Sequence, residues 1–244
     1  MKSLHWILEK SGKEYKILST WHPLSSQKRK IDLVKKGEVD ILYAGTSIQL
    51  EKELLPIWFP IMRGLIGRRI FIIHQNYQVE YDLVSNLNDL KNHMGIQGLG
   101  WEDIQILEAS GLKQVEKAYD DIFKNINAGS RYYFSRGVTE VFSEYHDRKT
   151  KMPNLVVEKR ILLEYKIAVF FFVNRSNTEL ANIIKTGFLN GYEDGSYQRF
   201  FYNHPLIKRS MKQANLNKRT KIEIPNPFLS PETEAIPKQY WHQD

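Results

Sequence analysis

The stretch from Leu54 to Ile73, LLPIWFPIMRGLIGRRIFII, constrains the fold of this chain more than any other. It cannot form one helix or one strand, because Pro56 and Pro60 each lack a backbone N–H donor and favour extended geometry in the preceding residue. Its last part, Arg69–Ile73, is apolar and rich in β-branched residues, which is typical of a buried strand. We interpret the stretch as the end of one compact unit and a connection that enters a second unit as a strand.

A second apolar run, IAVFFFV at Ile167–Val173, has the composition of a fully buried strand. We interpret it as the return connection to the first unit. On this interpretation, residues 1–71 and 169–244 form a discontinuous first lobe, and residues 72–168 form a second lobe. Helix and strand patterns alternate in both parts, so the predicted class is α/β, with two lobes, a central cleft and two crossing strands.

Shorter patterns predict the remaining elements. Strands are expected at residues 15–18, 39–43, 132–134 and 155–162, and helices at 4–10, 25–36, 87–91, 100–109, 119–128, 138–145, 178–192 and 198–202. Ser25 and Ser26 are expected to cap the second of these helices. Residues 215–244 are rich in proline and polar side chains, which predicts an extended tail.

Composition excludes several classes of function. The net charge is +7, but basic residues cluster only at 28–30, 68–69 and 208–221, without a nucleic-acid motif, so we interpret them as a solvated surface rather than a nucleic-acid site. Cysteine is absent, which excludes disulfides, thiolate catalysis and cysteine metal sites. The histidines show no metal-binding spacing, so neither a metal nor a cofactor is expected. No apolar run is long enough to span a membrane, and residues 1–9 lack the hydrophobic region of a signal peptide, so the chain is either cytosolic or lacks its leader.

Six stretches together resemble a known family. They are GEVDILYAGTS (37–47), LLPIWFPIMRGLIGRRIFII (54–73), GIQGLGWEDIQIL (95–107), AGSRYYFSRGVTE (128–140), FFFVNRSNTELANIIKTGF (170–188) and DGSYQRFF (194–201). In this order and spacing they resemble solute-binding proteins of the type 2 periplasmic-binding fold, in the amino-acid-binding-like branch of extracellular solute-binding protein family 3.

The resemblance implies a function. It implies a monomeric periplasmic protein that closes two lobes on a small polar solute by a hinge motion, without catalysis. It also implies that the solute passes to the membrane permease of an ABC transporter, or that the closed form signals to a sensor protein.

Two departures from the family pattern affect the expected ligand. Family members usually begin with a strand whose following loop contacts the ligand, whereas Leu4 already lies in the first expected helix, so we expect a truncated or trimmed first lobe that lacks this strand. Amino-acid binders also carry an arginine soon after the Thr-Ser turn, which grips the α-carboxylate by a bidentate pair. Leu50 takes that position here, and the nearby Lys52 cannot form the fork, which argues against an ordinary amino acid as the ligand.

Four candidate ligand-binding residues fall in the first lobe. The resemblance places Gly45, Thr46 and Ser47 in the contact turn, where backbone and hydroxyl groups could hold a carboxylate or an amine; the alternative is a plain turn. Arg63 stands where the family pattern favours a basic residue. It could face the cleft or be a solvated surface arginine.

Three candidates of the second lobe surround a helix start. Gln97, Gly98 and Trp101 precede the expected helix, whose N-terminal amides attract anions. Trp101 could stack on a planar or cationic group, or be a core tryptophan. Glu102 and Asp103 are expected to stabilise the helix start rather than to bind ligand.

Arg136 is the fourth candidate of this lobe. It lies in the turn where amino-acid binders often carry an aspartate for the ligand's amine, so a cation here shifts the expected preference to an anionic group. The competing interpretation is a salt bridge with Glu140. Tyr132 and Tyr133 are expected to divide between the core and the cleft.

Other functions remain open at this point. An enzyme on the same fold, such as a dehydratase, would need a general acid or base, and Glu102, Asp103 and Glu140 are the carboxylates linked to the motifs. A ligand-sensing module of a signalling system is a further alternative. A nucleic-acid binder is the least supported.

Overall fold

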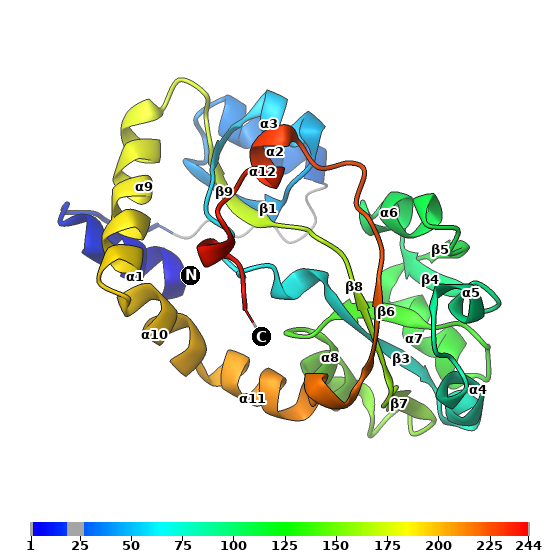
Figure 1. Cartoon of the computed structure of the whole chain (residues 1–244). Coiled ribbons are helices and arrows are strands. Elements are labelled where there is room, and N and C mark those ends of the chain that lie inside the picture. Colours follow the sequence, from blue (N-terminus) through cyan, green and yellow to red (C-terminus); the bar gives the residue numbers. More distant parts are fainter. Residues whose placement is uncertain (1, 19–26, 244) are drawn as a thin grey trace. The chain divides into compact units, whose positions relative to one another are not determined.

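The computed structural model describes residues 2–18 and 27–243, and the chain divides into two compact units (Figure 1). The first unit comprises Met1–Gly64, Ala168–His204 and Leu229–Asp244, and the second comprises Leu65–Ile167 and Pro205–Phe228. The chain therefore passes between the units four times, not twice as the sequence suggested. The predicted helix cap at Ser25 and Ser26 lies outside the described residues.

In its described part, the first unit is built on a three-stranded antiparallel sheet in the order β1–β9–β2, made by Ile41–Gly45, Val169–Val173 and Leu55–Ile57. Phe171 and Val173 of β9 face one hydrophobic core, whereas Phe170 and Phe172 face another. Because cores cover both faces of the sheet, every side chain of the central strand is apolar, which is the physical reason for the run that the sequence shows.

Helices cover both faces of this sheet (Figure 1). Ile7 of α1 and Ile184 of α9 belong to the first core, and Val34 of α2 belongs to the second. A Cβ atom at Gly187 would lie 2.0 Å from the carbonyl oxygen of Ile7, so α1 packs against α9 at a distance that only glycine allows. The helices of this unit are α1 (Lys2–Ser11), α2 (Gln27–Lys35), α3 (Ile48–Glu53), α9 (Thr178–Glu193), α10 (Ser196–Asn203) and α12 (Pro231–Glu234).

The second unit contains a mixed sheet in the order β10–β8–β3–β6, and β7 also pairs with β3. β4 and β5 form a parallel pair, and a bridge joins Gly95 of β4 to Tyr133, the residue before β6. The strands are β3 (Arg68–His74), β4 (Gly95–Gly98), β5 (Gln114–Lys117), β6 (Phe134–Gly137), β7 (Leu155–Val157), β8 (Ile161–Glu164) and β10 (Thr220–Glu223). The helices are α4 (Gln78–Asp82), α5 (Leu87–Leu90), α6 (Asp103–Ala109), α7 (Tyr119–Asn127), α8 (Val141–Arg148) and α11 (Pro205–Ala214).

The segment Pro205–Phe228 lies in the second unit, whereas the predicted bounds placed it in the first. β10 pairs in parallel with β8, with Thr220 opposite Ile161. Arg219 secures this pairing, because its Nη1 atom donates to the carbonyl oxygens of Glu158 and Ile161 at 2.8 and 3.0 Å. These long-range bonds have no local sequence signal, so the sequence could not place the segment.

Other predicted elements differ in detail. Residues 13–18 are irregular and Leu18 is 73% exposed, so the strand predicted at 15–18 is wrong. A short alternating segment becomes a strand only where a neighbour supplies hydrogen bonds. The predicted tail contains β10 and α12, and the sequence did not predict α3, β5 or α11. No helix within residues 2–18 and 27–243 combines the length and apolarity needed to cross a membrane.

Candidate functional site

The second unit gathers its four predicted site residues around adjoining strands. Gln97 and Gly98 lie on β4, Arg136 lies on β6, and Trp101 lies in the turn between β4 and α6. Gln97 is fully buried and its Nε2 atom donates to the carbonyl oxygen of Ser135 at 3.3 Å. This hydrogen bond links β4 to the strand that carries Arg136.

Arg136 is enclosed by carboxylates and aromatic rings. Its Nε and Nη2 atoms donate to the two carboxylate oxygens of Glu144, each at 2.8 Å, and Nη2 also lies 3.0 Å from Glu140 Oε1. The Arg136 side chain is 9% exposed. Burial opposes its charged form, but the hydrogen bonds to Glu144 and the attraction of Glu140 outweigh burial and raise the pKa of Arg136.

Trp101 lies against Arg136. The guanidinium carbon of Arg136 lies 4.8 Å from the centre of the Trp101 ring and 5.1 Å from the centre of the Phe134 ring, within the range of cation–π contacts. A Cβ atom at Gly98 would lie 2.2 Å from the Trp101 ring. Gly98 is thus required so that the indole can lie against β4 beside Arg136.

A second buried ion pair lies on the neighbouring strand β3. Arg69 is 2% exposed, and its Nη2 atom donates to Asp103 Oδ2 at 2.6 Å. Tyr165 donates from its hydroxyl to Asp103 Oδ1 at 2.9 Å, and burial raises the pKa of Tyr165. Asp103 therefore binds two internal partners, which agrees with a structural role rather than ligand contact.

Glu140 links the two arginines. Its Oε2 atom accepts from the Gly137 backbone N–H at 3.1 Å and lies 3.9 Å from Arg69 Nη1. Its side chain is 32% exposed, against 12–13% for Asp103 and Glu144. It is therefore the carboxylate of this cluster that an external molecule could reach most readily.

Tyr119 completes the cluster around Glu144. Its hydroxyl donates to Glu144 Oε1 at 2.7 Å, and burial together with this hydrogen bond raises the pKa of Tyr119. The sequence did not suggest Glu144, Tyr119 or Tyr165 as members of the site. Only the spacing of Glu144, eight residues after Arg136, could have indicated a pairing, and that spacing alone is not specific.

In the first unit, the predicted turn lies at the end of β1. Thr46 is buried and its hydroxyl donates to Glu51, whose Oε1 atom also accepts from the Thr233 hydroxyl at 2.8 Å. Ser47 is the N-cap of α3 and accepts from the Leu50 N–H at 3.3 Å. Gly45 has open space where a Cβ atom would stand. The turn is thus tied to the C-terminal part of the chain through Glu51.

Arg63 is buried within the first unit. It is 4% exposed, so it is not a solvated surface arginine. Its Nη2 atom donates to the carbonyl oxygens of Gln239 and Trp241 at 3.1 and 2.8 Å, and its guanidinium lies over the rings of Tyr192 and Tyr202. Arg63 therefore holds the C-terminal segment of the first unit.

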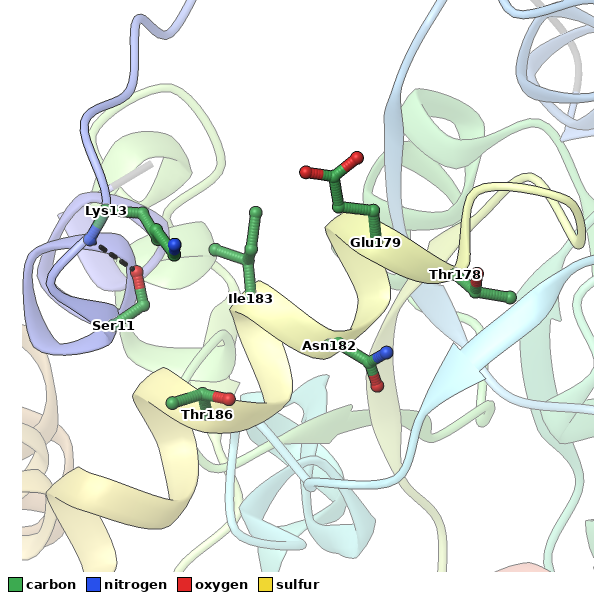
Figure 2. Close-up of a pocket in the computed structure, with 7 residues that line it drawn as sticks. All are labelled: Ser11, Lys13, Thr178, Glu179, Asn182, Ile183 and Thr186. Carbon is green, nitrogen blue, oxygen red and sulfur yellow. Dashed lines mark hydrogen bonds between the residues drawn. The ribbon is translucent and has the colours of Figure 1, made fainter.

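A groove of about 480 Å³ opens elsewhere on the first unit (Figure 2). Lys13, which follows α1, and Glu179 and Ile183 of α9 project along it. The groove contains none of the predicted site residues.

The architecture is the type 2 periplasmic-binding fold, as the sequence predicted, and comparison with known proteins confirms this fold. No protein-family model matches the chain, and no curated protein matches its sequence.

Solved structures do match the chain. One is an amino acid ABC transporter substrate-binding protein from Streptococcus pneumoniae bound to L-arginine, with a TM-score of 0.58, 12% identity and coverage of 87% of this chain and 83% of that one. Another is an ancestral arginine-binding protein bound to glutamine, with a TM-score of 0.56, 14% identity and coverage of 82% and 84%. A histidine kinase sensor domain with similarity to periplasmic binding proteins matches with a TM-score of 0.52, 16% identity and coverage of 81% of each chain.

Proposed function

We propose that this protein is an extracytoplasmic solute-binding protein, which captures a small polar solute between its two units for the permease of an ABC transporter. The observation that supports this most is the fold, which is shared with transporter substrate-binding proteins over more than four fifths of both chains. In this mechanism the solute contacts residues of both units at once, and binding favours the closed form because only that form makes both sets of contacts.

The charges of the second-unit cluster refine the expected solute. Arg136 no longer argues for an anion by itself, because Glu140 and Glu144 place two negative charges against its single positive charge. Asp103 and Arg69 balance each other. The cluster therefore carries one negative charge in excess, which disfavours an anion, and a polar solute that donates a hydrogen bond to Glu140 is the best match to this unit.

Catalysis is not part of the proposal. Asp103, Glu140 and Glu144 each lie within ion-pair distance of an arginine, which is the arrangement of structural ion pairs more than of a general acid or base. A ligand-sensing role is the second candidate, and the match to a histidine kinase sensor domain favours it. Both candidates require solute binding, so the same first experiment serves both.

The test is a thermal-shift screen of amino acids and other small polar metabolites. A ligand at 100 times its Kd should stabilise the protein by about 2.7 kcal/mol. Glu140→Gln in the second unit and Ser47→Gly in the first should each weaken the binding of a confirmed ligand about fivefold or more, because the first replaces a charged acceptor with a neutral amide and the second removes a hydroxyl group. Lys124→Gln, at a side chain that is 65% exposed, is the control and should leave the affinity unchanged.

The outcomes separate the alternatives. Capture between the units would be contradicted if only one of Glu140→Gln and Ser47→Gly changed the affinity of the ligand. It would also be contradicted if no compound in the screen stabilised the protein. Consumption of a ligand during incubation, followed by NMR, would indicate an enzyme instead.

A further inference from the structure

We infer that Arg136 fills, from within the chain, a cage suited to a cation, and that it thereby excludes cationic groups from the second unit. This inference deepens the proposed function and rests on it for its meaning in solute selection. The geometry of the cage itself does not depend on that function.

The cage consists of two carboxylates and two aromatic rings. Glu144 grips Arg136 by two parallel hydrogen bonds of 2.8 Å, and Glu140 adds a third contact at 3.0 Å. Trp101 and Phe134 lie with ring centres 4.8 and 5.1 Å from the guanidinium carbon. Carboxylates together with aromatic rings are the groups that recognise a guanidinium or an alkylammonium ion.

The enclosure of its carboxylate partners distinguishes Arg136 from Arg148, a partly buried arginine of the same unit. Arg148 also lies over aromatic rings, with its guanidinium carbon 4.0 Å from the Phe123 ring centre, but its carboxylate partner is Asp120, whose side chain is 78% exposed. The carboxylate partners of Arg136 are 13% and 32% exposed. Arg136 is therefore held by the protein as a bound cation would be held, whereas Arg148 makes an open ion pair.

The parts of the cage come from separate elements. Glu140 and Glu144 lie just before and within α8, Phe134 lies on β6, and Trp101 precedes α6. Without the Arg136 guanidinium, these side chains would enclose two carboxylates with no cation between them. The position would then favour any small cation that matches the fork of Glu144.

This arrangement has a consequence for specificity. While Arg136 occupies the cage, a cationic solute meets a filled position, and the carboxylates that could bind it are already engaged. Removal of the Arg136 side chain should convert the same position into a cation site. Arg136 is thus a specificity-determining residue. It fills the space of the cage and pairs with the carboxylates that would otherwise bind a cation.

Chemical rescue tests the inference. Arg136→Ala should lower the melting temperature by about 5–10 °C, because it removes the arginine partner of the largely enclosed Glu144 and of the more exposed Glu140. Ethylguanidinium at millimolar concentration should restore at least half of this loss with saturable dependence. The neutral isostere ethylurea should restore none of it, and the wild type should show no increase with either compound.

Arg148→Ala is the matched control. It removes an arginine from the same unit and should show no rescue by ethylguanidinium, because its partner is exposed. An equal response of the two variants, or equal effects of ethylguanidinium and ethylurea on Arg136→Ala, would overturn the inference. If Arg136→Ala does not fold alone, refolding in ethylguanidinium should recover folded protein, and failure to recover it would also overturn the inference.

A solute screen separates this inference from the proposed function. Arg136→Ala should bind cationic amino acids at least about tenfold more tightly than the wild type does, as expected for a charge-assisted pair. Rescue without any solute binding by the wild type would support the cage and contradict the proposed function. Solute binding without rescue would support the function and contradict the cage.

Discussion

Replacing Glu144 with glutamine tests the ion pair at the centre of the candidate site. The substitution keeps the shape of the side chain and one acceptor for the Tyr119 hydroxyl, but it removes the charge that receives two hydrogen bonds from Arg136. Removing one partner of a buried ion pair costs about 3–5 kcal/mol. Glu140 remains 3.0 Å from Arg136 but is 32% exposed, so it offsets part of this cost. We expect a loss of about 2–3 kcal/mol in the free energy of unfolding.

Urea denaturation measures this loss as a shift in the midpoint with an unchanged slope. A double-mutant cycle with Arg136→Met should give a coupling energy of about 1.5–3 kcal/mol, because the two residues are in direct contact. Asp121→Asn is the control, since it breaks an exposed ion pair with Lys124 and should leave the midpoint unchanged. If Glu144→Gln shifts the midpoint no more than Asp121→Asn, the pair does not stabilise the unit and the argument from its geometry is refuted.

Two further substitutions have defined outcomes. Gly98→Ala should lower the free energy of unfolding by about 1–3 kcal/mol and change the tryptophan emission, because the new methyl group would lie 2.2 Å from the Trp101 ring. Gly45→Ala is the control and should be nearly neutral, because its methyl group would meet nothing within 4 Å. Equal urea midpoints of the two variants would contradict this prediction. His93 is half-buried beside Tyr81, and burial lowers its pKa from 6.5, so the folded protein binds its proton less readily than the unfolded chain. The contribution of neutral His93 to stability is therefore complete above about pH 6.5 and is lost as the pH falls below that value. Between pH 7 and pH 5, the melting temperature of His93→Gln should consequently fall less than that of the wild type. An identical fall in both would show that His93 does not titrate in this range.

Arg136 illustrates how far a sequence can lead toward a site. The sequence marked the residue as functional and named both ligand contact and a salt bridge with Glu140 as interpretations. The structure adds Glu144 as the main partner and Trp101 as the ring that lies against the guanidinium. Whether the cluster contacts a solute remains a prediction, which the variants above address.

The fold class followed from local patterns that burial imposes. The run Val169–Val173 is apolar throughout because both faces of the sheet are covered, so its composition alone indicated a buried strand. The helix at Thr178–Glu193 was predicted to within one residue, because its apolar residues recur at the helical period and its end falls before Gly195. Periodicity of this kind is a property of neighbouring residues and is therefore readable from the sequence.

Only the tertiary structure decided which distant residues meet. Pro205–Phe228 joins the second unit because β10 pairs with β8, and Arg63 is buried because the last residues of the chain return to it. The pair of hydrogen bonds between Arg136 and Glu144 likewise depends on how α8 packs against β3 and β7. Such partners are set by the distances and directions that packing imposes across long separations in the chain, and no short pattern of residues carries that information.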